Sequence, residues 1–127
     1  MNILIVDDKP NLARVTAIAL RTLECQAFTA GTTAAATRLL DTEMIDAVFL
    51  DINLGGENGF DFLSKLAAEA HRPPVIIFTS HTQDEVGAEA KNRGAFACLL
   101  KPFTLDDLRQ QLARIKEHSQ GKAARSA

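Results

Sequence analysis

Acidic, hydroxyl and basic side chains follow four of the apolar runs in this 127-residue chain, at the point where each run ends. Asp7 and Asp8 come after the first run, Asp51 ends the third, Thr79 ends the fourth, and Lys101 follows the fifth. If these runs are parallel strands of one sheet, their carboxyl ends meet at one edge, which is where such sheets bind ligands. The spacing therefore predicts that three carboxylates, a hydroxyl and an ammonium converge.

Such a cluster favours phosphoryl chemistry assisted by a metal ion. Two like charges about 4 Å apart repel by roughly 4 kcal/mol at an effective dielectric constant of 20, and Lys101 supplies only one positive charge. A hard divalent cation is implied, and Mg²⁺ suits an open site with few carboxylates. Asp51 is then a candidate oxygen nucleophile that forms an aspartyl phosphate, with Lys101 and Thr79 beside the phosphoryl oxygens.

Five short apolar runs supply the strands that would position these groups. Most of them are apolar throughout, as expected of strands covered on both faces. The second run is the most polar, which predicts an edge strand. The expected strands are Asn2–Val6, Cys25–Thr29, Asp46–Leu50, Pro74–Thr79 and Phe96–Leu100.

Segments of helical length and period separate the runs. The first begins near Pro10, whose missing N–H is tolerated at a helix start. The fourth has little to bury and contains Gly87, which makes it the weakest helix. The alternation predicts an α/β fold, a doubly wound (βα)5 parallel sheet of five strands. The other expected helices are Thr33–Asp41, Phe60–Ala70, Gln83–Asn92 and one that opens at the N-cap Thr104.

Composition narrows the class of protein. Apolar residues make up 46% and charged residues 24%, and the formal net charge is −2, which argues against disorder and against direct nucleic-acid binding. The apolar runs are too short to span a membrane, and the N-terminus does not resemble a signal peptide. Two cysteines fit a reducing cytoplasm. We expect one domain over residues 1–118, then a disordered tail or the start of a linker over 119–127.

The constellation of strand-end residues resembles the receiver domain of two-component response regulators, over residues 2 to about 118. The resemblance implies a flavodoxin-like sheet with strand order 2-1-3-4-5 and Asp51 as the phosphoacceptor. It also implies that Mg²⁺ is bound by Asp7, Asp8, Asp51 and the backbone carbonyl of Asn53. The implied phosphoryl donor is a histidine kinase or a phosphotransfer protein.

The resemblance also implies how the signal leaves. By this resemblance, Thr79, followed by Ser80, would be the switch hydroxyl, and the bond between Lys101 and Pro102 would be cis. The resemblance implies that the output passes through the face made by helix 4, strand 5 and helix 5. We expect it to reach a partner protein, an effector domain such as a transcriptional one, or a second copy in a homodimer. By the same resemblance, Asn53 and His81 stand at positions that influence how water reaches the acyl phosphate. The alternative for His81 is an exposed loop residue with no role.

Two positions depart from the family pattern. Gly55 stands four residues after the phosphoacceptor, where a proline is usual, and we expect a more flexible loop there. Cys98 stands where the family places an aromatic that swings on activation. A cysteine is too small for that movement, which predicts an altered switch. Strand alternation predicts that Phe96 lies on the same face as Cys98.

Two other functions share parts of this pattern. A phosphohydrolase that forms an aspartyl phosphate needs a second carboxylate two residues after the nucleophile, and that position is Asn53. A flavodoxin-like cofactor binder would share the fold, but a tight acidic cluster is a poor host for a phosphate-bearing cofactor. The glycine-rich turn from Gly55 to Gly59 matches neither the dinucleotide fingerprint nor the P-loop.

Overall fold

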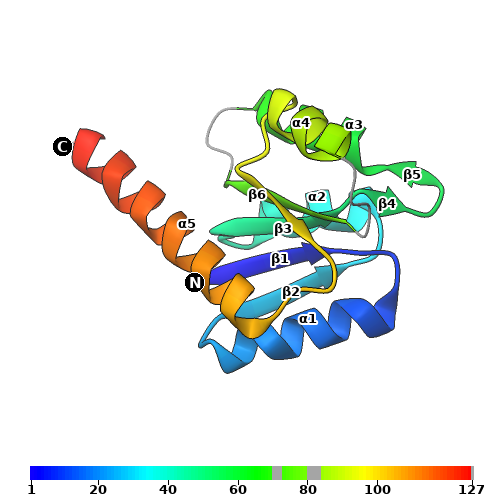
Figure 1. Cartoon of the computed structure of the whole chain (residues 1–127), viewed down its shortest axis with the longest axis horizontal. Coiled ribbons are helices and arrows are strands. Elements are labelled where there is room, and N and C mark those ends of the chain that lie inside the picture. The colour runs from blue at the N-terminus through cyan, green and yellow to red at the C-terminus, as the bar shows by residue number, and fades with distance from the viewer. Residues whose placement is uncertain (70–72, 80–83, 127) are drawn as a thin grey trace.

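The computed structural model describes the backbone of residues 1–69, 73–79 and 84–126, and it forms an α/β sandwich (Figure 1). The strands are β1 (Asn2–Val6), β2 (Gln26–Ala30), β3 (Ala47–Asp51), β4 (Asn53–Leu54), β5 (Glu57–Asn58), β6 (Val75–Thr79) and β7 (Ala97–Leu100). The helices are α1 (Pro10–Thr22), α2 (Thr33–Thr42), α3 (Gly59–Ala67), α4 (Asp84–Asn92) and α5 (Leu105–Ser126).

The main sheet is parallel and has the order β2-β1-β3-β6-β7. Because β4 and β5 form a separate hairpin, this is the predicted order 2-1-3-4-5, with β2 at the predicted edge. In the register of the central strands, Val6 pairs with Leu50, and Asp51 pairs with Phe78. The chain switches direction between β1 and β3, so the carboxyl ends of these two strands open side by side.

Two apolar cores hold the sheet between its helices. On one face, α1 and α5 pack against the sheet through Leu20, Leu108 and Ile115, which are 1% exposed or less. On the other face, α2, α3 and α4 pack through residues such as Leu63 and Ala90, which are fully buried. Figure 1 shows the two layers of helices. Burial on both faces explains why the central strands are continuous apolar runs.

Local signals set most helix starts. Pro10 occupies the first turn of α1. The Thr32 hydroxyl accepts a hydrogen bond from Ala35 N at 3.1 Å and begins α2. The Asn58 side chain accepts from Phe60 N at 2.9 Å and begins α3. The Asp107 carboxylate accepts from Thr104 N at 2.8 Å, and its own N–H donates to the Thr104 hydroxyl at 3.1 Å.

A short hairpin between β3 and α3 was not predicted. β4 and β5 pair antiparallel, with Leu54 opposite Glu57 across the two-residue turn of Gly55 and Gly56. Gly55 has a φ of +63°, which glycine adopts readily at the first central position of such turns. The loop expected to be flexible therefore has backbone pairing of its own. Two residues per strand are too few to show an alternating pattern in the sequence.

Phe96 lies on the face opposite to the predicted one. Strand β7 begins at Ala97, so the alternation of side chains does not extend back to Phe96. Its ring packs in the α5 core, 5.3 Å from the His118 ring between centroids and 5.4 Å from the Arg114 guanidinium. Cys98 packs in the opposite core. Phe96 therefore cannot compensate for the small side chain at Cys98.

Two helix ends also differ from their predicted positions. α3 ends at Ala67, before the predicted end at position 70. α5 continues to Ser126, so the backbone beyond residue 118 is helical where an irregular segment was expected. Residues 119–126 contain no proline and one glycine, Gly121, and their alanine, lysine, glutamine and arginine residues favour helix. In Figure 1 the end of α5 projects away from the sheet.

Across the described part of the chain, no helix is both long enough and apolar enough to cross a membrane.

Candidate functional site

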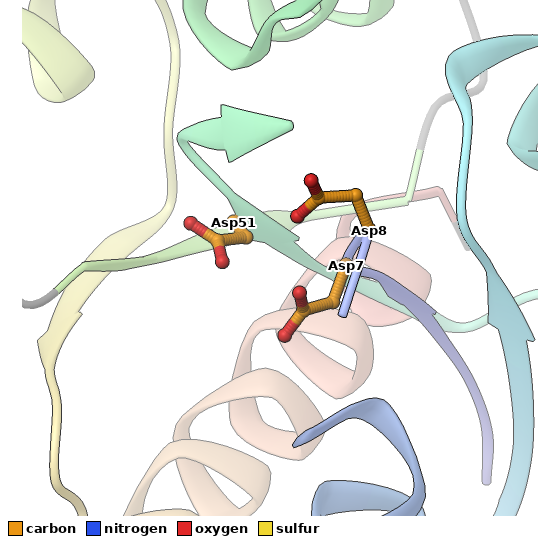
Figure 2. Close-up of side chains that lie close together, drawn as sticks. All are labelled: Asp7, Asp8 and Asp51. Atoms are coloured by element: carbon orange, nitrogen blue, oxygen red, sulfur yellow. The ribbon is translucent and has the colours of Figure 1, made fainter. Parts of the chain in front are cut away.

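Asp7, Asp8 and Asp51 form one acidic cluster at the carboxyl edge of the sheet. One carboxylate oxygen of each lies within 4.8 Å of those of the other two. Figure 2 shows the three side chains converging, Asp7 and Asp8 just beyond β1 and Asp51 at the end of β3. The adjacency of β1 and β3 in the sheet brings them together, as predicted.

Asp51 is only 3% exposed, and two of its contacts within the described part of the site hold its carboxylate. Its Oδ2 atom lies 3.1 Å from Lys101 Nζ, and its Oδ1 atom accepts a hydrogen bond from Asn53 N at 3.0 Å. The hydrogen bond from the Asn53 backbone N–H closes a turn directly after β3 and orients the Asp51 side chain. One oxygen is thus oriented by the backbone, while the other faces the lysine and the open edge of the sheet.

Asp7 and Asp8 each have a buried oxygen without a hydrogen-bond partner. These atoms are Asp7 Oδ2 and Asp8 Oδ1. Asp7 Oδ1 accepts from Lys9 N at 3.0 Å, whereas Asp7 Oδ2 faces Lys101 Nζ at 3.7 Å, too far for a hydrogen bond. Buried carboxylate oxygens are costly to leave unpaired. Both atoms belong to residues of the cluster, where a bound cation would offer a partner to carboxylate oxygens.

Lys101 is the positive centre of the site. Its ammonium contacts Asp51 and Asp7 and lies 4.5 Å from the centroid of the Phe78 ring. A ring face attracts a cation and limits the positions that the lysine can reach. The peptide bond between Lys101 and Pro102 is cis, which confirms the expectation from the family resemblance. The Lys101 N–H donates to the Thr79 carbonyl at 2.7 Å, joining the ends of β6 and β7.

The other predicted site residues occupy different positions around the cluster. Thr79 is 3% exposed and ends β6, one residue beyond the partner of Asp51. Cys98 is half-buried beneath α4, and burial raises the pKa of its thiol. Ser80 and His81 lie outside the described residues, so the structure does not place them.

Three contacts at the site were not found by sequence reasoning. Phe78 lies beside Lys101, Gly55 lies against Asp8, and Glu57 of the hairpin binds Thr33 at the start of α2. Phe78 carries no sequence signal, since it is one more apolar residue in a buried strand. A contact between Glu57 and Thr33, which are 24 residues apart, follows from no local spacing.

A comparison with protein families identifies the chain. The model of the response regulator receiver domain matches residues 3–113. The chain belongs to this family. As a receiver domain of two-component response regulators, it is a signalling domain, and its fold is the flavodoxin-like receiver fold.

Individual relatives agree with this assignment. The chain is 34% identical over 112 residues to the alginate biosynthesis transcriptional regulatory protein AlgB of Pseudomonas putida, covering 88% of this receiver domain and 25% of AlgB. It is 37% identical over 108 residues to the regulatory protein AtoC of Escherichia coli, covering 84% and 23%. The chain thus spans about a quarter of the length of these curated relatives.

A solved receiver domain has the same architecture over its whole length. The receiver domain of NtrX from Brucella abortus superimposes with a TM-score of 0.84 at 29% identity, covering 91% of this chain and 98% of that one. Within such a fold, the acidic cluster and Lys101 stand at the edge where ligands of doubly wound sheets bind.

Proposed function

We propose that Asp51 accepts a phosphoryl group and so acts as the phosphoacceptor of a phosphorelay. The observation that carries this proposal is the position of Asp51 Oδ2, buried in the acidic cluster 3.1 Å from Lys101 Nζ. In the transfer, a carboxylate oxygen of Asp51 attacks the phosphorus of a phosphohistidine. A P–O bond forms as the P–N bond breaks, and the electron pair of that bond returns to the imidazole.

The receiver's own side chains would promote this transfer. The Lys101 ammonium lies beside the oxygen that would carry the phosphoryl group, where it balances the added negative charge. The Phe78 ring and the contact with Asp7 limit the positions of the ammonium before the reaction. Asn53 N binds the second oxygen of Asp51, so the attacking oxygen is the one that faces the lysine. Self-catalysed transfer and slow loss of the phosphoryl group are the expected activities.

The donor set fits Mg²⁺. Three carboxylates with two unpaired buried oxygens form a cluster of oxygen ligands with the charge that a hard divalent cation requires. Asp7, Asp8 and Asp51 would hold the ion, together with the backbone carbonyl of Asn53. When bound, Mg²⁺ would supply positive charge next to the phosphoryl oxygens.

The partners follow from the family. Receiver domains take phosphoryl groups from histidine kinases, and we propose a histidine kinase or a phosphotransfer protein as the donor here. The relative AlgB is named a transcriptional regulatory protein and is about four times as long as the matched region. We therefore propose an effector domain or partner protein that controls transcription.

The two free cysteines support a location in the reducing cytoplasm, where thiols stay unpaired.

We further propose that the signal leaves through the face formed by α4, β7 and α5, which would contact an effector or a second copy of the chain. α4 has a small apolar contact with the sheet, made by the fully buried Ala90 and the half-buried Val86. Cys98 lies in the same cluster and has no ring that could swing. Phosphorylation would thus shift α4 through packing around Thr79 and Cys98.

Amide hydrogen exchange tests this route. The exchange rates should change over residues 84–100 when a phosphoryl mimic is bound, and changes confined to other residues would contradict the route.

Phosphorylation from a small acyl-phosphate donor tests the central proposal. Wild-type protein should incorporate acid-stable, base-labile phosphate with Mg²⁺ and incorporate little with a chelator. Asp51→Asn should incorporate none, because the amide is a poor nucleophile. Equal labelling of the wild type and Asp51→Asn would overturn the assignment.

A further inference from the structure

The β4–β5 hairpin lies against one of the three carboxylates. A Cβ atom on Gly55 would be 2.8 Å from Asp8 Oδ2, so only a glycine lets the turn approach this side chain so closely. Asp8 is half-buried, and its other oxygen is one of the two unpaired atoms of the cluster. The position of the hairpin therefore limits where the Asp8 carboxylate can point.

Glu57 attaches the hairpin to a neighbouring helix. Both carboxylate oxygens of Glu57 lie 3.3 Å from Thr33 N, and Oε2 also accepts a hydrogen bond from the Thr33 hydroxyl. Thr33 is the first residue of α2, where backbone N–H groups lack partners within the helix and a negative charge is favoured. Three contacts at one carboxylate make this a strong attachment for a surface loop.

The β4–β5 hairpin connects Glu57 to the acidic cluster. Glu57 pairs with Leu54 across the turn, and Leu54 is 3% exposed. Leu54 lies on β4 next to Asn53, whose backbone N–H donates to Asp51 Oδ1. Gly55 contacts Asp8 at the tip of the turn. A shift of Glu57 would therefore move the backbone that lies against two of the three carboxylates.

We propose that Glu57 is a positioning residue for the metal site. By binding the first turn of α2 it holds the hairpin against Asp8, and it thereby sets the affinity of the site for Mg²⁺. The inference rests on the proposed function, in which Asp7, Asp8 and Asp51 bind this ion. The attachment of Glu57 also explains why the loop is ordered although it has Gly55 at the position where the family usually has a proline.

Calorimetric titration with MgCl2 tests the inference. Glu57→Gln keeps the shape of the side chain but removes the charge, and Thr33→Val removes the hydroxyl donor. Each should weaken Mg²⁺ binding by about tenfold, the lower end of the range for residues that orient metal ligands. The two changes remove the same attachment, so the double variant should lose less than the product of the single effects. Glu43→Gln is the matched control, because this exposed residue directly follows the other end of the same helix.

Amide exchange and unfolding separate positioning from a general loss of stability. In a chelator, the hairpin amides of residues 53–58 should exchange faster in Glu57→Gln than in the wild type. Lower stability with unchanged Mg²⁺ affinity would overturn the inference and leave the proposed function intact. A wild-type protein that does not bind Mg²⁺ would overturn the proposed metal site and this inference together.

Discussion

At the scale of single residues, the acidic cluster places function in conflict with stability. Asp7, Asp8 and Asp51 are held close together, and Lys101 contacts Asp7 and Asp51. Buried like charges cost free energy, and such a cost is common at sites that must bind a ligand. In the proposed Mg²⁺ site, carboxylate oxygens that lack partners in the free protein would become favourable contacts once the cation is bound.

Replacing one of these charges should therefore stabilise the metal-free protein. Asp8→Asn is expected to raise the free energy of unfolding in a chelator by about 1 kcal/mol, since it removes repulsion at a buried, unpaired oxygen. In Mg²⁺ at about 100 times its dissociation constant the wild type should gain about 2.7 kcal/mol, and Asp8→Asn should gain less. Urea unfolding with and without Mg²⁺ measures both effects. Asp41→Asn, at an exposed position on α2, is the control; a loss of stability in chelator for Asp8→Asn would contradict this interpretation.

The two thiols should react slowly in the folded protein. Burial raises the pKa of both Cys25 and Cys98 above the usual thiol value. The folded state holds these protons more tightly than the unfolded state. Their contribution to stability is therefore complete below the usual thiol pKa and is lost as the pH rises through the raised value. At about pH 8, alkylation should be slower in native protein than in urea, where thiols titrate near 8.5. The Cys25→Ala variant allows the alkylation rate of Cys98 to be measured by itself. Equal alkylation rates of Cys98 in native protein and in urea would show that its thiol is not shielded.

At the scale of secondary-structure elements, the sequence predicted the strands better than the connections. Each predicted strand agrees with the structure to within one residue at either end, because burial on both faces produces continuous apolar runs. The β4–β5 hairpin was missed because its four paired residues carry no periodic pattern. The predicted side of the sheet for Phe96 was wrong because we extended the strand alternation to one residue before β7 begins.

The hairpin explains why Gly55 should not be replaced by the proline that is usual in the family. Gly55 has a φ of +63°, and proline requires about −65°. Gly55→Pro should therefore destabilise the protein by more than about 1 kcal/mol, rather than stabilise it as proline does at compatible positions. Gly56→Ala is the matched control, since a Cβ there meets nothing within 4 Å. Thermal unfolding compares them, and a more stable Gly55→Pro would mean that the turn adopts another conformation.

At the scale of the whole molecule, the residues that could be predicted are those at strand ends. Asp7, Asp8, Asp51 and Lys101 meet because a parallel sheet gathers the ends of its strands at one edge. Contacts such as those between Glu57 and Thr33 depend on how a loop packs against a helix, which no local pattern records. The length of α5 was also underestimated, since helix-forming residues continue beyond Ile115, the last buried position among the described side chains.

The packing of α5 suggests where the folded unit ends. Ile115 is fully buried, and His118 contacts the Phe96 ring. Truncation after residue 118 should change the free energy of unfolding by less than about 0.5 kcal/mol. Truncation after residue 114 removes Ile115 and should cost about 2–5 kcal/mol. Urea unfolding of the two shortened chains gives both values; a large loss after residue 118 would extend the domain beyond the predicted boundary.

The role of Asp51 is tested most directly by identifying the phosphorylated residue chemically. Wild-type protein is incubated with an acyl-phosphate donor and Mg²⁺, and borohydride then reduces the acyl phosphate to an alcohol before peptide mass spectrometry. We expect reduction at position 51 alone, dependent on Mg²⁺, and none in Asp51→Asn. Reduction at position 7 or 8, or undiminished reduction in Asp51→Asn, would contradict the assignment of Asp51 as the phosphoacceptor.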